Sequence, residues 1–186
     1  MTDILPLEGA DFDIVTLVQG DHRTIRALFG RIEGCAPSER EQVWPELLRT
    51  LAVHEVAEEM VVFPAVRVIT DEHGPALEAR IAEQVQAEKL LVQMEDMDPA
   101  SDEFAGALAI LKSSVLEHAA AEEREVLPLI AQNDTALDRP TLGARYVDAQ
   151  RRAPTHPHPN APHRPPGNMV VGPVASLFDR IRDHLG

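Results

Sequence analysis

Two copies of one short pattern place a strong constraint on how this chain can fold. In each copy a histidine is followed four residues later by the first of two glutamates, and a proline comes after them. The first copy starts at His54 and contains Glu58, and the second starts at His118 and contains Glu122. Positions i and i+4 of an α-helix lie one turn apart on the same face. Each copy therefore directs one imidazole and one carboxylate toward a common point, and the pattern predicts two halves of one metal site.

Apolar residues at three- and four-residue steps predict four amphipathic helices. The first helix covers residues 11–33 and the second about residues 39–70. The third follows Gly74, and the fourth begins near Ser101. Short loops between helices force antiparallel neighbours, and no strand-like alternation competes with this pattern. The predicted fold is all-α: an antiparallel up-down-up-down four-helix bundle with a C-terminal extension that ends in a short helix.

The predicted helix ends carry their own signals. Ser38-x-x-Glu41 has the form of a capping box, which predicts the start of the second helix. Pro64 and Pro128 lie inside helical patterns at matching positions of the two copies. A proline lacks the amide hydrogen that a helix interior needs, so each should end or kink its helix. The matching positions indicate that the two helical hairpins are structural duplicates.

The character of the chain changes after residue 133, which divides it into a bundle of residues 1–133 and an extension of residues 134–186. Residues 151–168 are rich in proline and histidine and cannot form a helix. The segment Gly172 to Gly186 is amphipathic again and predicts a short helix that docks on the bundle or on another subunit. Tyr146 lies outside the predicted bundle, so it can approach the site only if the extension folds over it.

Composition excludes some classes of protein. The formal net charge is −14, and a nucleic-acid-binding surface needs clustered lysine and arginine that the chain lacks. No apolar run is long enough to span a membrane. Cys35 is the single cysteine, which rules out an intrachain disulfide and suits a reducing compartment. We expect a cytoplasmic protein, while its oligomeric state stays open.

Polar residues on the apolar faces of the predicted helices define the candidate site. They are His22, His54, Glu58, Gln84, Glu88, His118 and Glu122. A single inward histidine can be a core residue that is hydrogen-bonded to a neighbour. Three carboxylates buried in one layer without cations would be severely unfavourable, and metal ions remove that conflict. Imidazole and carboxylate ligands without thiolate suit iron, and sometimes manganese or zinc, whereas structural zinc prefers cysteines.

The ligand set favours two ions. Glu58 and Glu122 come from different helices and can bridge ions a few ångströms apart. His22 and His54 would serve one ion. His118 would serve the other, together with a group from the third helix.

These motifs resemble those of the hemerythrin-like (HHE cation-binding) domains over about residues 11–132. The resemblance rests on His22 in the first helix and on the His-x-x-x-Glu copies at His54 and His118. It implies a non-haem di-iron centre, oxo- and carboxylate-bridged, that binds dioxygen or reacts with dioxygen, peroxide or nitric oxide in oxidative or nitrosative stress. A peroxide-consuming, catalase-like activity is one form of this. The Pro/His-rich extension is similar to that of some bacterial members.

The third helix departs from the family pattern, because Gln84 stands where the family has its histidine. An amide is a poorer ligand for iron than imidazole. Glu88, one turn further along the same face, is the expected substitute, and Gln84 would line the site or act as a weak ligand. An added carboxylate would favour ferric iron and disfavour reversible oxygen carriage. The other outcome is an asymmetric site that holds its second ion weakly.

A second class of function stays open on the sequence. The bundle could be a metal-poor helical interaction module, or an iron-responsive sensor, whose extension recruits a partner. The departure at Gln84 gives this alternative some weight.

Overall fold

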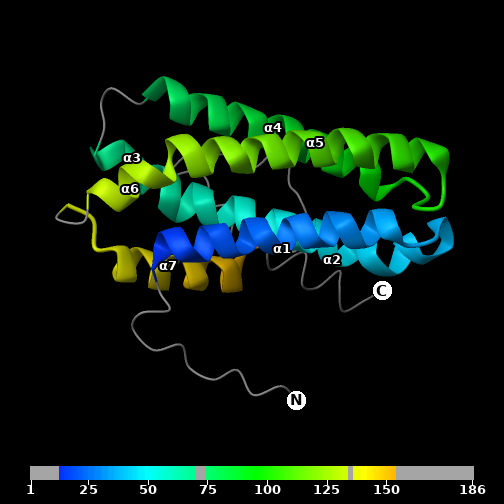
Figure 1. The fold of residues 1–186 in the computed structure, drawn as a ribbon, viewed down its shortest axis with the longest axis horizontal. Coiled ribbons are helices and arrows are strands. Elements are labelled where there is room, and N and C mark those ends of the chain that lie inside the picture. Colours follow the sequence, from blue (N-terminus) through cyan, green and yellow to red (C-terminus); the bar gives the residue numbers. More distant parts are fainter. Residues whose placement is uncertain (1–12, 70–73, 134–135, 154–186) are drawn as a thin grey trace, which may run out of the picture.

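The computed structural model describes residues 13–69, 74–133 and 136–153, and within these ranges every regular element is helical (Figure 1). Helix α1, Ile14–Gly34, begins at Asp13, whose carboxylate accepts a hydrogen bond from the amide of Thr16 at 2.9 Å. Such a cap satisfies one of the amide groups that a helix leaves unpaired at its start. The face of α1 that includes Val18, His22 and Ile25 is buried, as the apolar pattern predicted.

The second predicted helix is continuous over its length, but the type of helix changes along it. It comprises the 3₁₀ turn η2 (Pro37–Glu39), α2 (Arg40–Ala57), the π-helical segment η3 (Glu58–Val62) and α3 (Phe63–Ile69). The predicted capping box at Ser38 is wrong. The observed cap is Ala36, two residues before Ser38, and its amide donates to the Glu39 carboxylate at 2.9 Å. Pro37 explains the earlier start, because proline suits the first position of a helix, where no amide hydrogen is needed.

The prolines of the two copies have different local effects. Before Pro64 the helix widens into η3, where the amide of Phe63 donates to the carbonyl of Glu58, five residues back. A π turn of this kind accommodates a residue that cannot make the ordinary helical bond, and the helix continues through Pro64. Before Pro128 the helix breaks instead, because α5 (Asp102–Glu125) ends and the short α6 (Leu127–Gln132) begins after Val126.

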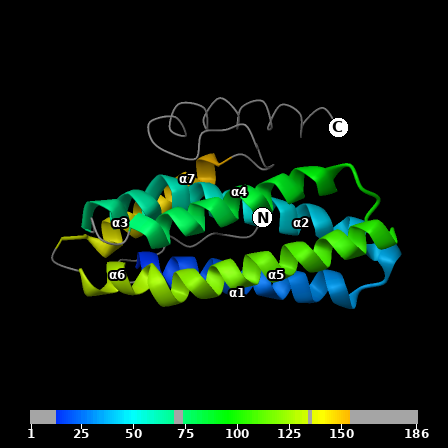
Figure 2. The ribbon, with the colours of Figure 1, turned by 90° about the horizontal axis from the view of Figure 1, so that it is seen from above.

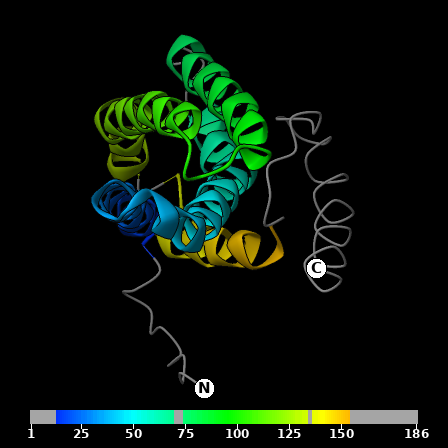
Figure 3. The same ribbon diagram turned by 90° about the vertical axis from the view of Figure 1, so that its right-hand side faces the viewer.

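The long helices lie lengthwise beside one another around a shared interior (Figure 3). Helix α1 packs against α2, and α4 (Gly74–Glu95) packs against α5. The described part of the chain is therefore a helical bundle, and the up-down-up-down order of four helices stays a prediction. None of the described helices is long and apolar enough to cross a lipid bilayer.

Two apolar clusters fill the interior, one toward each end of the bundle. Val18 of α1 belongs to the first cluster and Ile25 to the second, with His22 between them. In the second helix, Leu51 and Ala57 belong to different clusters in the same way and enclose His54. The inward polar residues thus form a layer between two apolar cores.

A further helix from the predicted extension lies on the bundle. Helix α7, Arg139–Arg152, starts at the cap Asp138 and packs against α1, α2 and η3 (Figure 2). Its Tyr146 is fully buried. The division of the chain after residue 133 stays a prediction, and the Pro/His-rich stretch beyond residue 153 and the expected C-terminal helix lie outside the described residues.

Candidate metal centre

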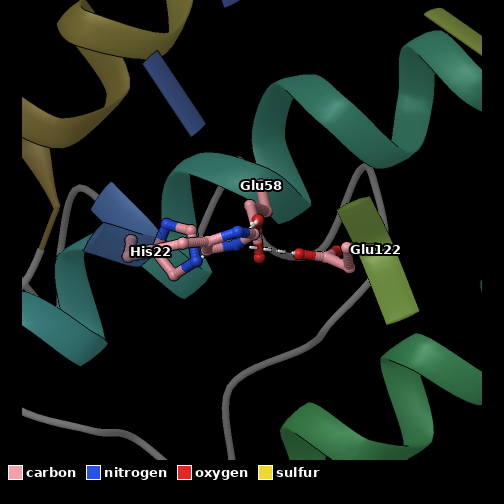
Figure 4. A group of neighbouring side chains, drawn as sticks. His22, Glu58 and Glu122 are labelled. Carbon is pink, nitrogen blue, oxygen red and sulfur yellow. Dashed lines mark ion pairs between the residues drawn. The ribbon is translucent and has the colours of Figure 1, made fainter. Parts of the chain in front are cut away.

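Four buried side chains meet in the polar layer, and they come from α1, from the continuous helix formed by α2 and η3, and from α5. They are His22 from α1, His54 from α2, Glu58 from η3 and Glu122 from α5, and one ligand atom of each lies within 4.8 Å of those of the others. Figure 4 shows His22, Glu58 and Glu122 pointing toward one another. Helical spacing produces this arrangement, because residues i and i+4 share one face of each helix.

The imidazoles present the same nitrogen, Nε2, to the two carboxylates. The Nε2 of His54 lies 3.3 Å from Oε1 of Glu58. The Nε2 of His22 lies 3.4 Å from Oε2 of Glu122 and 3.9 Å from Oε1 of Glu58. His118 joins from α5, with its Nε2 3.6 Å from Oε2 of Glu122. Three imidazoles and two carboxylates therefore face one another, with both glutamates shared.

The other nitrogen of each histidine, Nδ1, has a hydrogen-bonding partner outside the layer. Glu123 lies 2.9 Å from Nδ1 of His22, and Glu83 lies 3.0 Å from Nδ1 of His118. A carboxylate accepts the proton of Nδ1, which leaves the lone pair of Nε2 directed inward. Histidine ligands of metals are commonly oriented by such partners. The Nδ1 of His54 has a different partner, the hydroxyl of Tyr146 at 2.9 Å.

Several buried atoms of this layer have no hydrogen-bond partner among the described residues. They are Nε2 of His22 and His118, Oε1 of Glu58, Oε1 of Gln84, and both carboxylate oxygens of Glu122. Leaving one buried polar group unsatisfied costs about 1–3 kcal/mol, and more when the group is charged. A cation would satisfy imidazole lone pairs and carboxylate oxygens together, so the residues present fit a metal.

The pKa values of the residues in the metal-free layer also indicate that added positive charge is favourable there. Burial lowers the pKa of His22, but the nearby carboxylates of Glu122 and Glu58 outweigh it and raise that pKa to about 10. Burial raises the pKa of Glu122, but His22 and the charge of His118 outweigh it and lower that pKa to about 2. Burial and the charge of Glu122 raise the pKa of Glu58 well above 4.5. The raised pKa values of His22 and Glu58 therefore favour bound protons in this layer of the metal-free protein.

The third-helix candidates occupy different surroundings. Gln84 is 3% exposed, and its amide Nε2 donates to Oε2 of Glu58 at 2.8 Å, so Gln84 reaches the layer. Glu88 is also buried, but it is not among the four residues whose ligand atoms meet. After burial, the charge of Glu88 is the largest factor that raises the pKa of Glu55. The structure thus brings Gln84 to the centre and Glu88 close to Glu55.

A small cavity borders the histidines. Its volume is about 20 Å³, and its lining includes His22, His54, Gln84 and His118 together with apolar side chains such as Leu51. A cavity of this volume can hold one water-sized or diatomic molecule. The layer thus has room for a small ligand beside the nitrogen atoms.

Sequence reasoning missed Glu83 and Glu123, which hold two of the outer nitrogens, because they lie off the apolar faces of their helices. Both carried a signal. When the two hairpins are aligned so that Gln84 matches His22, Glu83 takes the position of Asp21. Glu123 is the second glutamate of the repeat copy that starts at His118. Tyr146 carried no such signal in the repeat, and it approaches the site because the extension folds over the bundle as α7.

The comparisons with known proteins agree with this arrangement. Residues 13–130 match the hemerythrin HHE cation binding domain. An uncharacterized hemerythrin-like protein of Schizosaccharomyces pombe is 27% identical over 167 residues, which cover 89% of this chain and 82% of that protein. A DNA nickase of Nostoc sp. is 27% identical over 124 residues, which cover 66% of this chain and 35% of the nickase. No solved structure matches at a significant level. Since the family match covers more than half of the chain, the protein belongs to the hemerythrin HHE cation-binding domain family.

Proposed function

We propose that the chain is a non-haem di-iron protein that binds or reacts with dioxygen, peroxide or nitric oxide in oxidative or nitrosative stress handling. The observation that carries the proposal is the layer in which three imidazole Nε2 atoms face two shared carboxylates, where several of these atoms are buried and lack hydrogen-bond partners within the described part of the chain. When bound there, iron would supply redox chemistry that protein side chains lack. The up-down-up-down order of four helices is part of the proposal.

The ligand assignment follows the positions of the side chains. His22 and His54 would hold one ion and His118 the other, with Glu58 and Glu122 shared between them. Gln84 lines the cavity together with the three histidines and presents a buried amide oxygen that has no hydrogen-bond partner among the described residues. An amide is a weaker ligand for iron than imidazole, so Gln84 would be a weak ligand. We propose that the ion beside His118 is the more loosely held, and that Glu88 approaches it when both ions are bound.

The cavity supports a small ligand, since its volume of about 20 Å³ suits a diatomic molecule or peroxide. The protein's own side chains have two tasks here. Leu51 and its apolar neighbours limit the entry of water, and the outer partners Glu83 and Glu123 keep the histidine lone pairs directed inward. Consumption of peroxide by the iron-loaded protein is the reaction to assay first. A reducing compartment such as the cytoplasm suits the unpaired Cys35.

Metal content tests the proposal directly. Purified protein is loaded with ferrous iron without oxygen, passed through a desalting column and analysed for iron per chain. We expect close to two irons per chain in the wild type and a large loss in Glu58→Ala. Glu41→Gln, an exposed glutamate of the same helix, is the matched control and should bind as the wild type does. Wild-type protein that retains far less than one iron, and shows no near-ultraviolet charge-transfer bands after exposure to air, would favour the metal-poor interaction module instead.

A further inference from the structure

Helix α7 contributes a hydrogen-bonded relay that ends at His54. The hydroxyl of Tyr146 lies 2.9 Å from Nδ1 of His54 and donates to Oδ2 of Asp21 at 2.8 Å. The amide Nε2 of Gln150, one turn further along α7, donates to the same carboxylate oxygen at 2.6 Å. Tyr146 is fully buried, so this relay is shielded from solvent along most of its length.

The two hairpins of the bundle explain why a tyrosine is present in one of them. In the second hairpin, Glu83 contacts Nδ1 of His118 directly at 3.0 Å. Its counterpart in the first hairpin is Asp21, which is one methylene shorter. The Oδ2 of Asp21 lies 3.6 Å from Nδ1 of His54, too far for a hydrogen bond. The hydroxyl of Tyr146 fills this gap.

The direction of the relay determines which nitrogen of His54 carries the proton. A tyrosine hydroxyl has one hydrogen, and here the carboxylate of Asp21 accepts it. The oxygen of Tyr146 must then accept a hydrogen from His54, so Nδ1 is protonated. The lone pair of Nε2 consequently faces Glu58, which lies 3.3 Å away.

We propose that Tyr146 is a positioning residue for the metal centre, and that α7 serves the site by fixing the tautomer and orientation of His54. The proposal concerns the same centre as the proposed function and rests on it for its purpose. The hydrogen bond itself exists in the metal-free protein. A failure of this proposal can therefore be distinguished from a failure of the protein to bind iron.

The first measurement uses metal-free protein labelled with ¹⁵N. Long-range proton–nitrogen correlation spectra at neutral pH show which ring nitrogen of each histidine is protonated. We expect His54 to carry its proton on Nδ1 in the wild type and to show a substantial population protonated on Nε2 in Tyr146→Phe. Thr141→Val also removes one hydroxyl from α7, but that hydroxyl bonds to Asp138 and does not contact His54, so it should match the wild type.

A rescue experiment separates positioning from packing. Asp21→Glu restores the missing methylene, so in a Tyr146→Phe background its carboxylate should reach Nδ1 of His54 as Glu83 reaches His118. The double variant is expected to return His54 to the Nδ1-protonated form. It should also recover iron retention against a chelator, which we expect to fall about 10- to 100-fold in Tyr146→Phe alone.

Three results would overturn the proposal. One is a wild-type His54 that is protonated on Nε2, which needs no variant to observe. Another is an unchanged tautomer and unchanged iron retention in Tyr146→Phe. The third is an equal loss of iron in Thr141→Val and Tyr146→Phe, which would indicate a general effect of α7 stability. If the wild type binds no iron, the proposed function fails, while the spectra still decide whether Tyr146 positions His54.

Discussion

The two glutamates of the polar layer should respond in opposite ways when each is converted to glutamine in the metal-free protein. Burial and the neighbouring Glu122 raise the pKa of Glu58 well above 4.5, which favours its neutral form. A glutamine has nearly the shape and charge of that neutral acid, and its oxygen can still accept the amide of Gln84. We expect Glu58→Gln to change the free energy of unfolding by less than about 1 kcal/mol.

Glu122→Gln should be costly, because Glu122 is ionised opposite His22. Lowering the pKa of Glu122 from 4.5 to about 2 corresponds to about 3 kcal/mol. The rise of the pKa of His22 to about 10 is larger because Glu58 contributes to it as well. The shift at Glu122 is therefore the better measure of this pair, and the two shifts are not added. Removing one partner of a buried ion pair commonly costs about 3–5 kcal/mol, which agrees with this magnitude.

Urea unfolding of the metal-free variants measures both effects, with the fluorescence of the single tryptophan, Trp44, as the signal. The pH dependence has a definite sign. The contribution of Glu122 is complete above pH 4.5 and is lost as the pH falls toward about 2. The contribution of His22 is complete below pH 6.5 and is lost as the pH rises toward about 10. The gap between wild type and Glu122→Gln should be widest between these limits, at about pH 4.5–6.5. Equal losses in Glu58→Gln and Glu122→Gln would refute the opposite pKa shifts of the two carboxyl groups, raised for Glu58 and lowered for Glu122.

Three further predictions concern the third helix, the start of α1 and the protons of the layer. Gln84→His should increase the iron retained per chain after chelator challenge, because imidazole is a better ligand than an amide; an unchanged stoichiometry would contradict this. Asp13→Ala should lower the free energy of unfolding by about 1 kcal/mol, because it removes the cap of α1, and urea titration checks this against the wild type. Metal binding should release protons and tighten as the pH rises from 6 to 8, since the pKa of His22 is raised to about 10 and that of Glu58 well above 4.5 in the metal-free protein. Calorimetry in buffers of different ionisation enthalpy measures that release, and an enthalpy independent of the buffer would rule it out.

The helical periodicity of the sequence was sufficient to predict the inward residues of the layer. His22, His54, Glu58 and Glu122 lie on apolar faces at i and i+4 spacing, and the structure brings them together. The same periodicity could not choose between Gln84 and Glu88. These residues share one face of α4 one turn apart, and the choice depends on how far the helix is shifted along its axis relative to its neighbours.

The outer hydrogen bonds were harder to predict, for a physical reason. Tyr146 reaches His54 because α7 docks on the bundle, and no local pattern in the sequence encodes that contact. Asp21 lies off the apolar face of α1, so a search for inward positions passes over it. The capping box at Ser38 had the right form but competed with Pro37, whose preference for the first helical position determined where the turn begins.

The π-helical segment η3 has a consequence for the ancestry of the fold. If the two hairpins descend from one duplicated unit, they have since accommodated the same proline in different ways, with a widened turn before Pro64 and a break before Pro128. The widened turn changes the phase of the residues that follow it, and α7 packs against this segment. One hairpin can therefore no longer replace the other in this fold. A chain assembled from two copies of either hairpin would lack the asymmetry on which the docking of α7 depends.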